Sequence, residues 1–495
     1  MTDQPLILVL DAGTTSTRAI LFDAAGAVAA VAQRELTQHY PAPGRVEHDA
    51  AEIWASTLAC AREAIAAVGG PARIAAIGIA NQRETVVAWD QATGEPLYHA
   101  LVWQDRRTAD TCAALREQGQ EPVVQARTGL LLDPYFSATK MAWLLREVPE
   151  VAAAATAGRL ALGTVESWLV FKLTGGLHIT DASNASRTSL LALDGASWDP
   201  QLCELLGVPQ AALPEVVDCA GDFATVAPAL FGAPIPLAGL VGDQQGATIG
   251  QGCLSPGDTK ATYGTGAFVL ANMGARLPRS GHRLLGTVLW QLGGKRVYAL
   301  EGSVFVAGSL IKWLRDGLGL IASAGETEAL ARSVPDSAGV VIVPALAGLG
   351  APHWQPDARG VITGLSFSAT KAHLVRAALE AMALQTYDLA TAFAADNAAW
   401  RTLRIDGGMS ANDWLAQDLA DMLALPVERP AMVETTALGA AMLAGVGAGL
   451  FDSLAAAAAA MRGPTRHFDP ALDEATRAAR ITAWRGALVC ALPSA

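Results

Sequence analysis

Hydrophobic runs broken by short polar turns open the chain. Leu6 to Leu10 form an uninterrupted apolar run, which predicts a buried strand. The run ends at a carboxylate, Asp11, and the polar segment Gly-Thr-Thr-Ser-Thr-Arg follows at residues 13–18. Ala19 to Phe22 are apolar again and predict a second strand. The pattern therefore predicts a strand, a polar turn and a strand, with no helix directly after the turn.

The same pattern recurs about half a chain later. Lys260 to Asn272 predicts a strand, a Gly-Thr turn and another strand. Leu403 to Asp406 predicts a strand that ends in Asp-Gly-Gly, before a helical pattern at Trp414 to Leu423. Two similar hairpins suggest a duplicated architecture with a ligand between the halves.

The first polar turn has the chemistry of a phosphate clamp. Gly13 allows close approach of the backbone to a ligand, and the N–H groups and hydroxyls of such a turn can bind an anion. Asp11 cannot hold a phosphate itself, but it can hold a magnesium ion that does. The alternative is an ordinary hairpin turn. Burial of a carboxylate at the end of a strand costs free energy unless the carboxylate has a partner, which favours a ligand-binding site over an ordinary turn.

Strands and amphipathic helices alternate along the chain, as in the helix at Ile53 to Ala66 and the strand at Ile74 to Ile79. This alternation predicts an α/β fold, and 495 residues suggest two or more domains. A glycine-rich stretch near the midpoint places the boundary at residue 248, which gives domains 1–248 and 249–495. Residues 436–451 are apolar but short, and predict a tightly packed buried helix and no membrane span.

Composition narrows the class of protein. Hydrophobic residues make up 52% and charged residues 17%, as in a compact soluble enzyme. The net charge of −12 argues against binding to nucleic acid or to an anionic membrane. The six cysteines include no C-x-x-C pair, which argues against zinc and thioredoxin-type sites. Scattered cysteines and the start Met-Thr-Asp-Gln-Pro, which lacks the features of a signal peptide, favour a cytoplasmic location.

Several common catalytic patterns are missing from the sequence. It contains no G-x-x-x-x-G-K-[ST], which argues against a P-loop kinase, and no H-E-x-x-H, G-x-S-x-G or G-x-G-x-x-G.

Two stretches match signatures of one family, Tyr135 to Trp143 and Gly360 to Leu365 with the helix His373 to Glu380 behind it. From about residue 6 to about residue 450 the chain resembles the FGGY carbohydrate kinases of the actin-like ATPase superfamily. The resemblance implies two actin-like (RNase H-like) domains with a cleft between them, ATP and Mg²⁺ as ligands, and a homodimer or homotetramer. Within the family, the chain is similar to the members that phosphorylate glycerol in six motifs, at residues 81–85, 102–107, 133–135, 184–188, 242–245 and 348–352.

Asp243 is the candidate for the catalytic base. It follows the apolar strand Leu237 to Val241. Phosphoryl transfer to an alcohol needs an acceptor for the hydroxyl proton, but a strand-end Asp can also cap a helix that begins near Gln245. The residues alone leave both interpretations open. The resemblance implies that Asp243 is the base and that it holds the magnesium ion together with Asp11.

Arg83 and Glu84 follow the strand that ends at Ile79. They could bind two adjacent hydroxyls through hydrogen bonds, with Arg donating and Glu accepting. Alternatively, they could form an exposed ion pair, which contributes little to stability. The resemblance places both in the polyol site, with three aromatic residues that composition alone would assign to the core. The implied polyol-binding residues are Arg83, Glu84, Trp103, Tyr135, Asp243, Gln244 and Phe268.

The resemblance also implies a nucleotide site. Its phosphate loop comprises Thr14, Thr15, Ser16 and Arg18, and its second half comprises Thr265, Gly308, Lys312, Gly408 and Asn412. Asn412 could instead cap a helix. The chain departs from the pattern at Lys312, where Gln is usual, at Ala12, where Gln is usual, and at Glu166, where Asp is usual. Lys cannot accept a hydrogen bond, so a contact of residue 312 with adenine would have to differ from the usual one. None of the three departures is a predicted polyol-binding residue, so they affect the prediction of nucleotide binding more than that of the substrate class.

Three functions remain open at this point. The first is phosphorylation of glycerol by ATP at a terminal hydroxyl. The second is phosphorylation of a larger polyol or a ketose, against which the segment Asn81 to Glu84 argues. The third is a non-catalytic actin-like nucleotide-binding regulator, against which the presence of both Asp11 and Asp243 argues.

Overall fold

Two mixed β-sheets form the centres of the two halves of the protein in the computed structural model, which describes residues 4–355 and 357–492. The first sheet has the order β11-β12-β5-β1-β2-β3, and the second has the order β15-β16-β14-β13-β19-β20-β21. The strands of the first sheet are β1 (Leu6–Ala12), β2 (Ser16–Asp23), β3 (Val28–Glu35), β5 (Ile74–Asn81), β11 (Ala220–Val226) and β12 (Ile235–Gly242). Those of the second are β13 (Asp258–Tyr263), β14 (Ala267–Gly274), β15 (Leu285–Leu292), β16 (Lys295–Val304), β19 (Thr402–Asp406), β20 (Val427–Pro430) and β21 (Thr465–Phe468).

The two sheets repeat one topology. β1, β2 and β3 are joined antiparallel, while β5 runs parallel to β1 and β12 runs parallel to β5. In the second sheet β13, β14 and β16 are antiparallel, β19 is parallel to β13, and β20 is parallel to β19. The predictions of an α/β fold and of a duplicated architecture are therefore confirmed.

Both predicted hairpins are present. β1 and β2 pair with Asp11 opposite Arg18, and in the turn Gly13 N–H donates to Ser16 C=O over 3.0 Å. β13 and β14 form the second hairpin, with Lys260 opposite Leu270. The polar turn thus connects two strands, as the hydrophobic pattern predicts.

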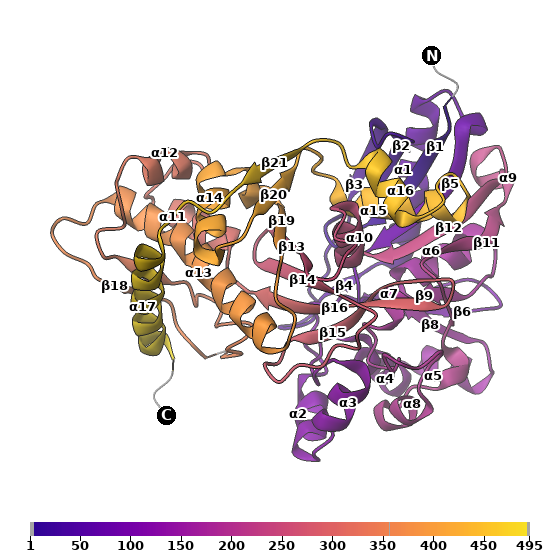
Figure 1. The fold of residues 1–495 in the computed structure, drawn as a ribbon. Helices are drawn as coiled ribbons and strands as arrows, with labels where there is room; N and C mark the ends of the chain where they lie inside the picture. The colour runs from indigo at the N-terminus through magenta and orange to yellow at the C-terminus, as the bar shows by residue number, and fades with distance from the viewer. Residues whose placement is uncertain (1–3, 356, 493–495) are drawn as a thin grey trace.

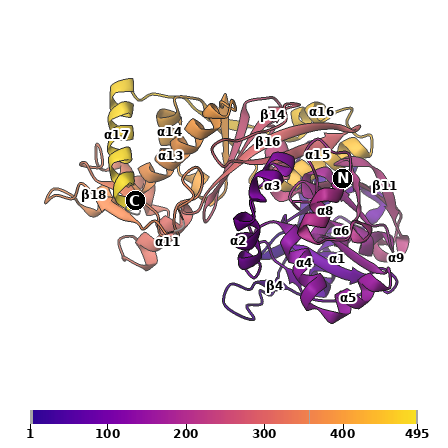
Figure 2. The ribbon, with the colours of Figure 1, turned by 90° about the horizontal axis from the view of Figure 1, so that it is seen from below.

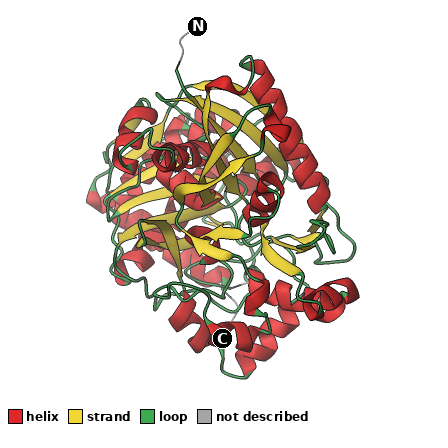
Figure 3. Ribbon diagram, turned by 90° about the vertical axis from the view of Figure 1, so that its right-hand side faces the viewer, coloured by secondary structure: helices red, strands yellow, loops and turns green. Residues whose placement is uncertain are grey.

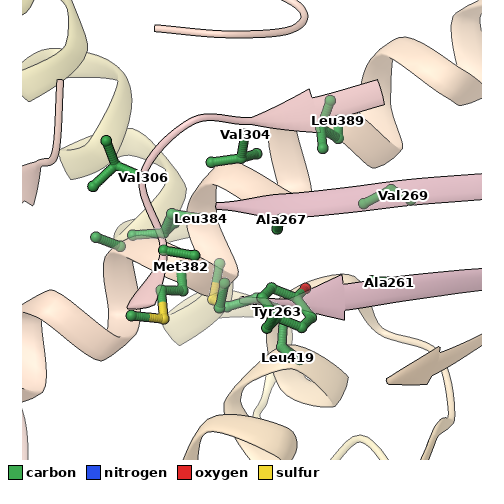
Figure 4. Packing of buried hydrophobic residues seen from close by; sticks show 14 of the residues in the cluster. Ala261, Tyr263, Ala267, Val269, Val304, Val306, Met382, Leu384, Leu389 and Leu419 are labelled. Carbon is green, nitrogen blue, oxygen red and sulfur yellow. The ribbon is translucent and has the colours of Figure 1, made fainter. Parts of the chain in front are cut away.

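The second sheet has two differently covered faces. Ala261, Tyr263, Ala267 and Val269 pack against α13 (Lys371–Ala395) and α14 (Asp413–Leu423), as the labelled side chains in Figure 4 show. The opposite face carries Leu270, which belongs to a core shared with the first sheet. β14 and β16 accordingly extend from one half of the molecule toward the other (Figures 1 and 2).

The first half also contains a small sheet of four strands. Its strands are β4 (Glu47–His48), β7 (Ala100–Leu101), β6 (Val86–Asp90) and β8 (Leu160–Thr164). Figure 3 shows helices lying around the strands of the molecule. The helices of this half are α1 (Ala50–Ala67), α2 (Ala109–Glu117), α3 (Glu121–Thr128), α4 (Ser137–Glu147), α5 (Pro149–Thr156), α6 (Val165–Thr174), α7 (Ala182–Ala185), α8 (Pro200–Leu206), α9 (Pro228–Phe231) and α10 (Asp243–Gly250). β9 (Ile179–Asp181) and β10 (Glu215–Val217) form a two-stranded sheet beside them.

Late elements of the chain return to the first sheet. α15 (Thr435–Gly447) packs on β1, β5 and β12, and α16 (Leu454–Met461) shares its core (Figure 1). α15 and α10 cross so closely that a Cβ on Gly439 would lie 1.9 Å from Gly246 C=O. The predicted buried helix is confirmed, and its glycines are what permit the crossing. The boundary at residue 248 stays a prediction.

The other late elements are α11 (Gly308–Asp316), α12 (Glu326–Arg332), β17 (Val341–Val343), β18 (Val361–Thr363) and α17 (Glu474–Ala491). β21 is an edge strand of the second sheet, too short for a clear alternation of apolar and polar residues to predict it from the sequence. No helix within residues 4–355 and 357–492 is long and apolar enough to cross a membrane.

Candidate active site

Arg83 and Glu84 lie in the short connection between β5 and β6, at the end of the first sheet. Both side chains are buried, so the alternative of an exposed ion pair is wrong. Glu84 has a φ of 61°, in the left-handed region that non-glycine residues rarely adopt. Such conformations persist only where the surroundings hold them, and they gather at functional sites.

Four buried charged side chains form one cluster around this connection. Glu301, from β16 of the second sheet, accepts from Arg83 Nη1 over 2.7 Å and from Arg83 Nη2 over 3.1 Å. Arg187 donates through Nε to Glu84 Oε1 over 2.6 Å and through Nη2 to Glu301 Oε1 over 3.3 Å. Despite burial, the two guanidinium groups hold the pKa of Glu301 at about 2. Burial dominates at Glu84 and raises the pKa of its carboxyl.

Asp243 is the first residue of α10, and its side chain is 33% exposed. The N-cap position belongs to Gly242, which has no capping side chain, but Asp243 Oδ1 accepts from Gln244 N–H over 2.6 Å at the start of α10, so the capping alternative stays open. Asp243 Oδ1 also lies 3.2 Å from Arg83 Nε. Burial raises the pKa of the Asp243 carboxyl, while the charges of Arg83 and Lys260 oppose that rise. A carboxylate of this kind is suited to accepting a proton.

Two of the three predicted aromatic residues line the same region. Tyr135 and Trp103 pack edge to face with ring centroids 5.6 Å apart, and the Tyr135 hydroxyl lies 3.5 Å from Arg83 Nη2. Trp103 Nε1 donates to the hydroxyl of Thr14 over 2.9 Å, which connects the predicted polyol region to the predicted phosphate loop. Phe268, on β14, is half-buried and lies opposite Ser303 of β16, two residues from Glu301.

The predicted phosphate loop is the turn between β1 and β2. Thr15 is exposed, and Ser16 accepts a hydrogen bond from Gln33. Arg18 pairs with Asp11 and with Glu434, each over 2.5 Å. Burial raises the pKa of the Asp11 carboxyl, and Arg18 opposes the rise. Arg18 therefore forms ion pairs with two carboxylates, one of which, Glu434, belongs to the segment just before α15.

Three predicted nucleotide residues of the second half lie together. Gly308 N–H donates to Gly264 C=O over 2.9 Å, and Thr265 C=O accepts from Ala307 N–H over 2.9 Å. A Cβ on Gly308 would lie 3.4 Å from Met409 of the next loop. At Gly408 a Cβ would meet no atom within 4 Å, which leaves that backbone open to a ligand.

Lys312 and Asn412 have different surroundings. Lys312 is exposed on α11, one turn after Gly308. Asn412 caps α14 by accepting from Leu415 N–H over 3.0 Å, and its amide donates to Thr327 over 3.1 Å. The capping alternative at Asn412 is confirmed, and its contact with a nucleotide stays a prediction.

The predicted donor set for magnesium consists of two carboxylates, Asp11 and Asp243. Asp11 lies close enough to Asp243 to help raise the pKa of the latter. No group of three or more His, Cys, Asp or Glu side chains that could hold a metal occurs in the described part of the chain. Mg²⁺ commonly keeps several waters and binds through one or two carboxylates plus phosphate oxygens, so these two residues fit it.

Four charged residues around the site carry no assignment from sequence: Arg187, Lys260, Glu301 and Glu434. Lys260 is fully buried on β13, and its Nζ donates to the side chain of Gln244, a predicted polyol residue. Arg187 and Lys260 lie inside segments identified in the sequence, at residues 184–188 and 260–272, and this position was the sequence signal that could have assigned them to the site. Glu301 and Glu434 lie in no such motif, and only the three-dimensional fold brings them to the site.

Comparisons with known proteins cover nearly the whole chain. The sequence model for the N-terminal domain of the FGGY family of carbohydrate kinases matches residues 6–250, and that for its C-terminal domain matches residues 259–448. The glycerol kinase of Rhodospirillum centenum is 56% identical over 490 residues, which is 99% of this chain and 98% of that protein. The glycerol kinase of Gluconobacter oxydans is 54% identical over 491 residues, 99% and 96% of the two chains.

Solved structures agree with the sequence comparison. The glycerol kinase of Plasmodium falciparum with ADP superposes with a TM-score of 0.95 at 34% identity and covers 99% of both chains. A xylulose kinase of Rhodospirillum rubrum gives a TM-score of 0.86 at 27% identity and covers 98% of both.

Proposed function

This chain belongs to the FGGY family of carbohydrate kinases, and from that premise we propose that it transfers the γ-phosphoryl group of ATP to a terminal hydroxyl of glycerol, giving sn-glycerol 3-phosphate. More than half of its residues are identical to those of curated glycerol kinases over nearly the full length. The ADP in the Plasmodium falciparum structure supports ATP as the donor.

One observation carries the proposal: Asp243 lies 3.2 Å from Arg83, whose neighbour Glu84 is a buried acceptor. In the proposed complex, Arg83 donates to one glycerol hydroxyl and Glu84 accepts from another. Asp243 takes the proton from the hydroxyl that attacks phosphorus, since a positioned carboxylate can act as a general base. Trp103, Tyr135 and Phe268 contact the carbon edge of glycerol, and Gln244 lies beside Asp243.

The nucleotide is proposed to lie between the two hairpin turns. Thr14, Thr15, Ser16 and Arg18 surround its phosphates, while the group at Thr265, Gly308, Lys312, Gly408 and Asn412 lies toward the nucleoside. Asp11 and Asp243 would hold Mg²⁺, which supplies neutralisation of phosphate charge when bound. A cytoplasmic homodimer or homotetramer, inferred from the family resemblance and the scattered cysteines, completes the proposal.

A coupled assay of ADP release with and without glycerol tests the proposal. Glycerol-dependent release is expected, together with a product that a glycerol 3-phosphate dehydrogenase oxidises. Release that depends on xylulose, and not on glycerol, would favour the ketose alternative that the Rhodospirillum rubrum structure keeps relevant. Nucleotide binding without release under any polyol would favour a non-catalytic regulator.

A further inference from the structure

Glu301 is the one carboxylate of the charged cluster that comes from the second half of the protein. It lies on β16, opposite Leu270 of β14, which lies opposite Lys260 of β13. Residues directly opposite each other share one face of a sheet. Glu301 and Lys260 therefore emerge on the same face of the second sheet, the face that contacts the first half.

The contacts of Arg83 show what Glu301 does to it. The two Nη atoms of Arg83 are both bound by Glu301, at 2.7 and 3.1 Å, while Nε on the other edge faces Asp243 at 3.2 Å. The stem of Arg83 passes against Gly242, where a Cβ would lie 2.8 Å from Arg83 Cγ. Glu301 and Gly242 thus fix the plane and the direction of the guanidinium group. A bidentate pair of this kind adds geometric specificity to charge.

Glu301 also connects Arg83 to Glu84. Arg187, fully buried, donates to both Glu301 and Glu84. The two guanidinium groups and the two carboxylates then neutralise one another, and all four side chains are buried. Without Glu301, two buried cations would face Glu84 and Asp243 alone, and removal of one partner of a buried pair leaves an uncompensated charge.

We propose that Glu301 is the positioning residue of the polyol pocket: its carboxylate, supplied by the second half of the protein, holds Arg83 and Arg187 in the arrangement that binds the acceptor hydroxyls. The proposal rests on the proposed function for the identity of the acceptor. It assigns no contact between Glu301 and substrate. Polyol binding then depends on β16, which carries Glu301. β16 is followed by α11, whose first residue, Gly308, belongs to the proposed nucleotide site.

The test compares Glu301→Gln and Glu301→Asp with wild type. Glu301→Gln keeps the volume and removes the charge, and an increase of tenfold or more in KM for glycerol is expected, with KM for ATP changed less than threefold. Glu301→Asp keeps the charge but is one methylene shorter, so an intermediate KM is expected. Glu380→Gln is the matched control, because Glu380 is also buried and is paired with Arg376 outside the charged cluster.

A second readout separates positioning from mere structure. Partial recovery of KM for glycerol in Glu301→Asp relative to Glu301→Gln, with kcat changed less than KM for glycerol in both variants, is expected of a residue that positions Arg83. A loss of folded protein alone would lower the apparent kcat and leave both KM values unchanged. Unchanged KM for glycerol in both variants, equal changes in both KM values, or failure of both variants to fold would each overturn the proposal.

The two proposals fail in different measurements. Wild-type turnover is measured first with glycerol and, if none occurs, with xylulose and other polyols. Absence of glycerol turnover in wild type overturns the proposed substrate. The inference on Glu301 is judged only from the ratio of variant to wild type, with whichever polyol wild type phosphorylates.

Discussion

The substitution Asp243→Asn tests the chemical step most directly. Asn has nearly the same shape as Asp but cannot accept the hydroxyl proton as a carboxylate does. Loss of a general base costs roughly 10²–10⁴ in rate, which corresponds to about 3–5 kcal/mol of transition-state stabilisation. We expect kcat to fall by that factor.

Glycerol affinity should change much less. Arg83 keeps both hydrogen bonds to Glu301 and loses only its pairing with Asp243, whose side chain is 33% exposed. Because the Asp243 carboxylate is partly open to solvent, which weakens an ion pair, while Arg83 itself is buried and keeps Glu301 as a partner, we expect the Kd for glycerol to rise by a much smaller factor than that by which kcat falls. Exposure of Asp243 thus allows catalysis and binding to be separated in one variant.

Steady-state kinetics give kcat, and calorimetric titration without nucleotide gives the Kd for glycerol. Asp110→Asn is a suitable control, since Asp110 is an exposed carboxylate in the first turn of α2. A variant that keeps more than half of the wild-type kcat would refute the assignment of Asp243 as base. Equal losses in kcat and in affinity would instead show that Asp243 serves mainly to hold Arg83.

Three further predictions follow from the site. Asp11→Ala should reduce Mg²⁺-dependent turnover far more than glycerol affinity, because Asp11 is proposed to hold Mg²⁺ and pairs with Arg18 in the predicted phosphate loop; an equal loss of glycerol affinity by calorimetry would contradict the proposed placement beside the metal. Lys312→Gln should change KM for ATP more than KM for glycerol, and an unchanged KM for ATP would mean that this exposed side chain points away from the nucleotide. Burial and the nearby Asp181 raise the pKa of Glu166 from 4.5 to about 7. The folded state therefore favours the protonated carboxyl, so stability is full below about pH 4.5 and declines by about 3 kcal/mol as pH rises to about 7. In urea unfolding across pH 5 to 8, Glu166→Gln should show a smaller decline than wild type, and an unchanged pH dependence would show that Glu166 does not titrate there.

Local sequence patterns predict those strands and turns of this protein that depend only on interactions between neighbouring residues. Apolar runs bounded by polar turns identify both hairpins, because a strand and its turn need only neighbouring residues. The resemblance assigns Arg83, Glu84, Tyr135 and Asp243 to one site, and the structure brings them together. Contacts of these residues with substrate stay a prediction.

Long-range pairing is what sequence patterns miss. Arg83 and Glu301 are 218 residues apart in the chain, and no spacing rule connects them. Arg18 and Glu434 are 416 residues apart, and they meet only because the segment before α15 returns to the first sheet. Asn412 shows the reverse case, in which a residue assigned to a ligand also has a purely local use as a helix cap.

The return of α15 to the first sheet has a consequence for synthesis of the protein. β1, β5 and β12 are made early, but the helix that covers them follows α10 by roughly 190 residues. At about 5–20 residues per second, the ribosome needs about 10–40 s to supply it. We expect the apolar face of the first sheet to stay uncovered for that time and to offer chaperones a binding surface. A fragment of the first 250 residues, which lacks α15, should therefore aggregate instead of folding as an independent domain.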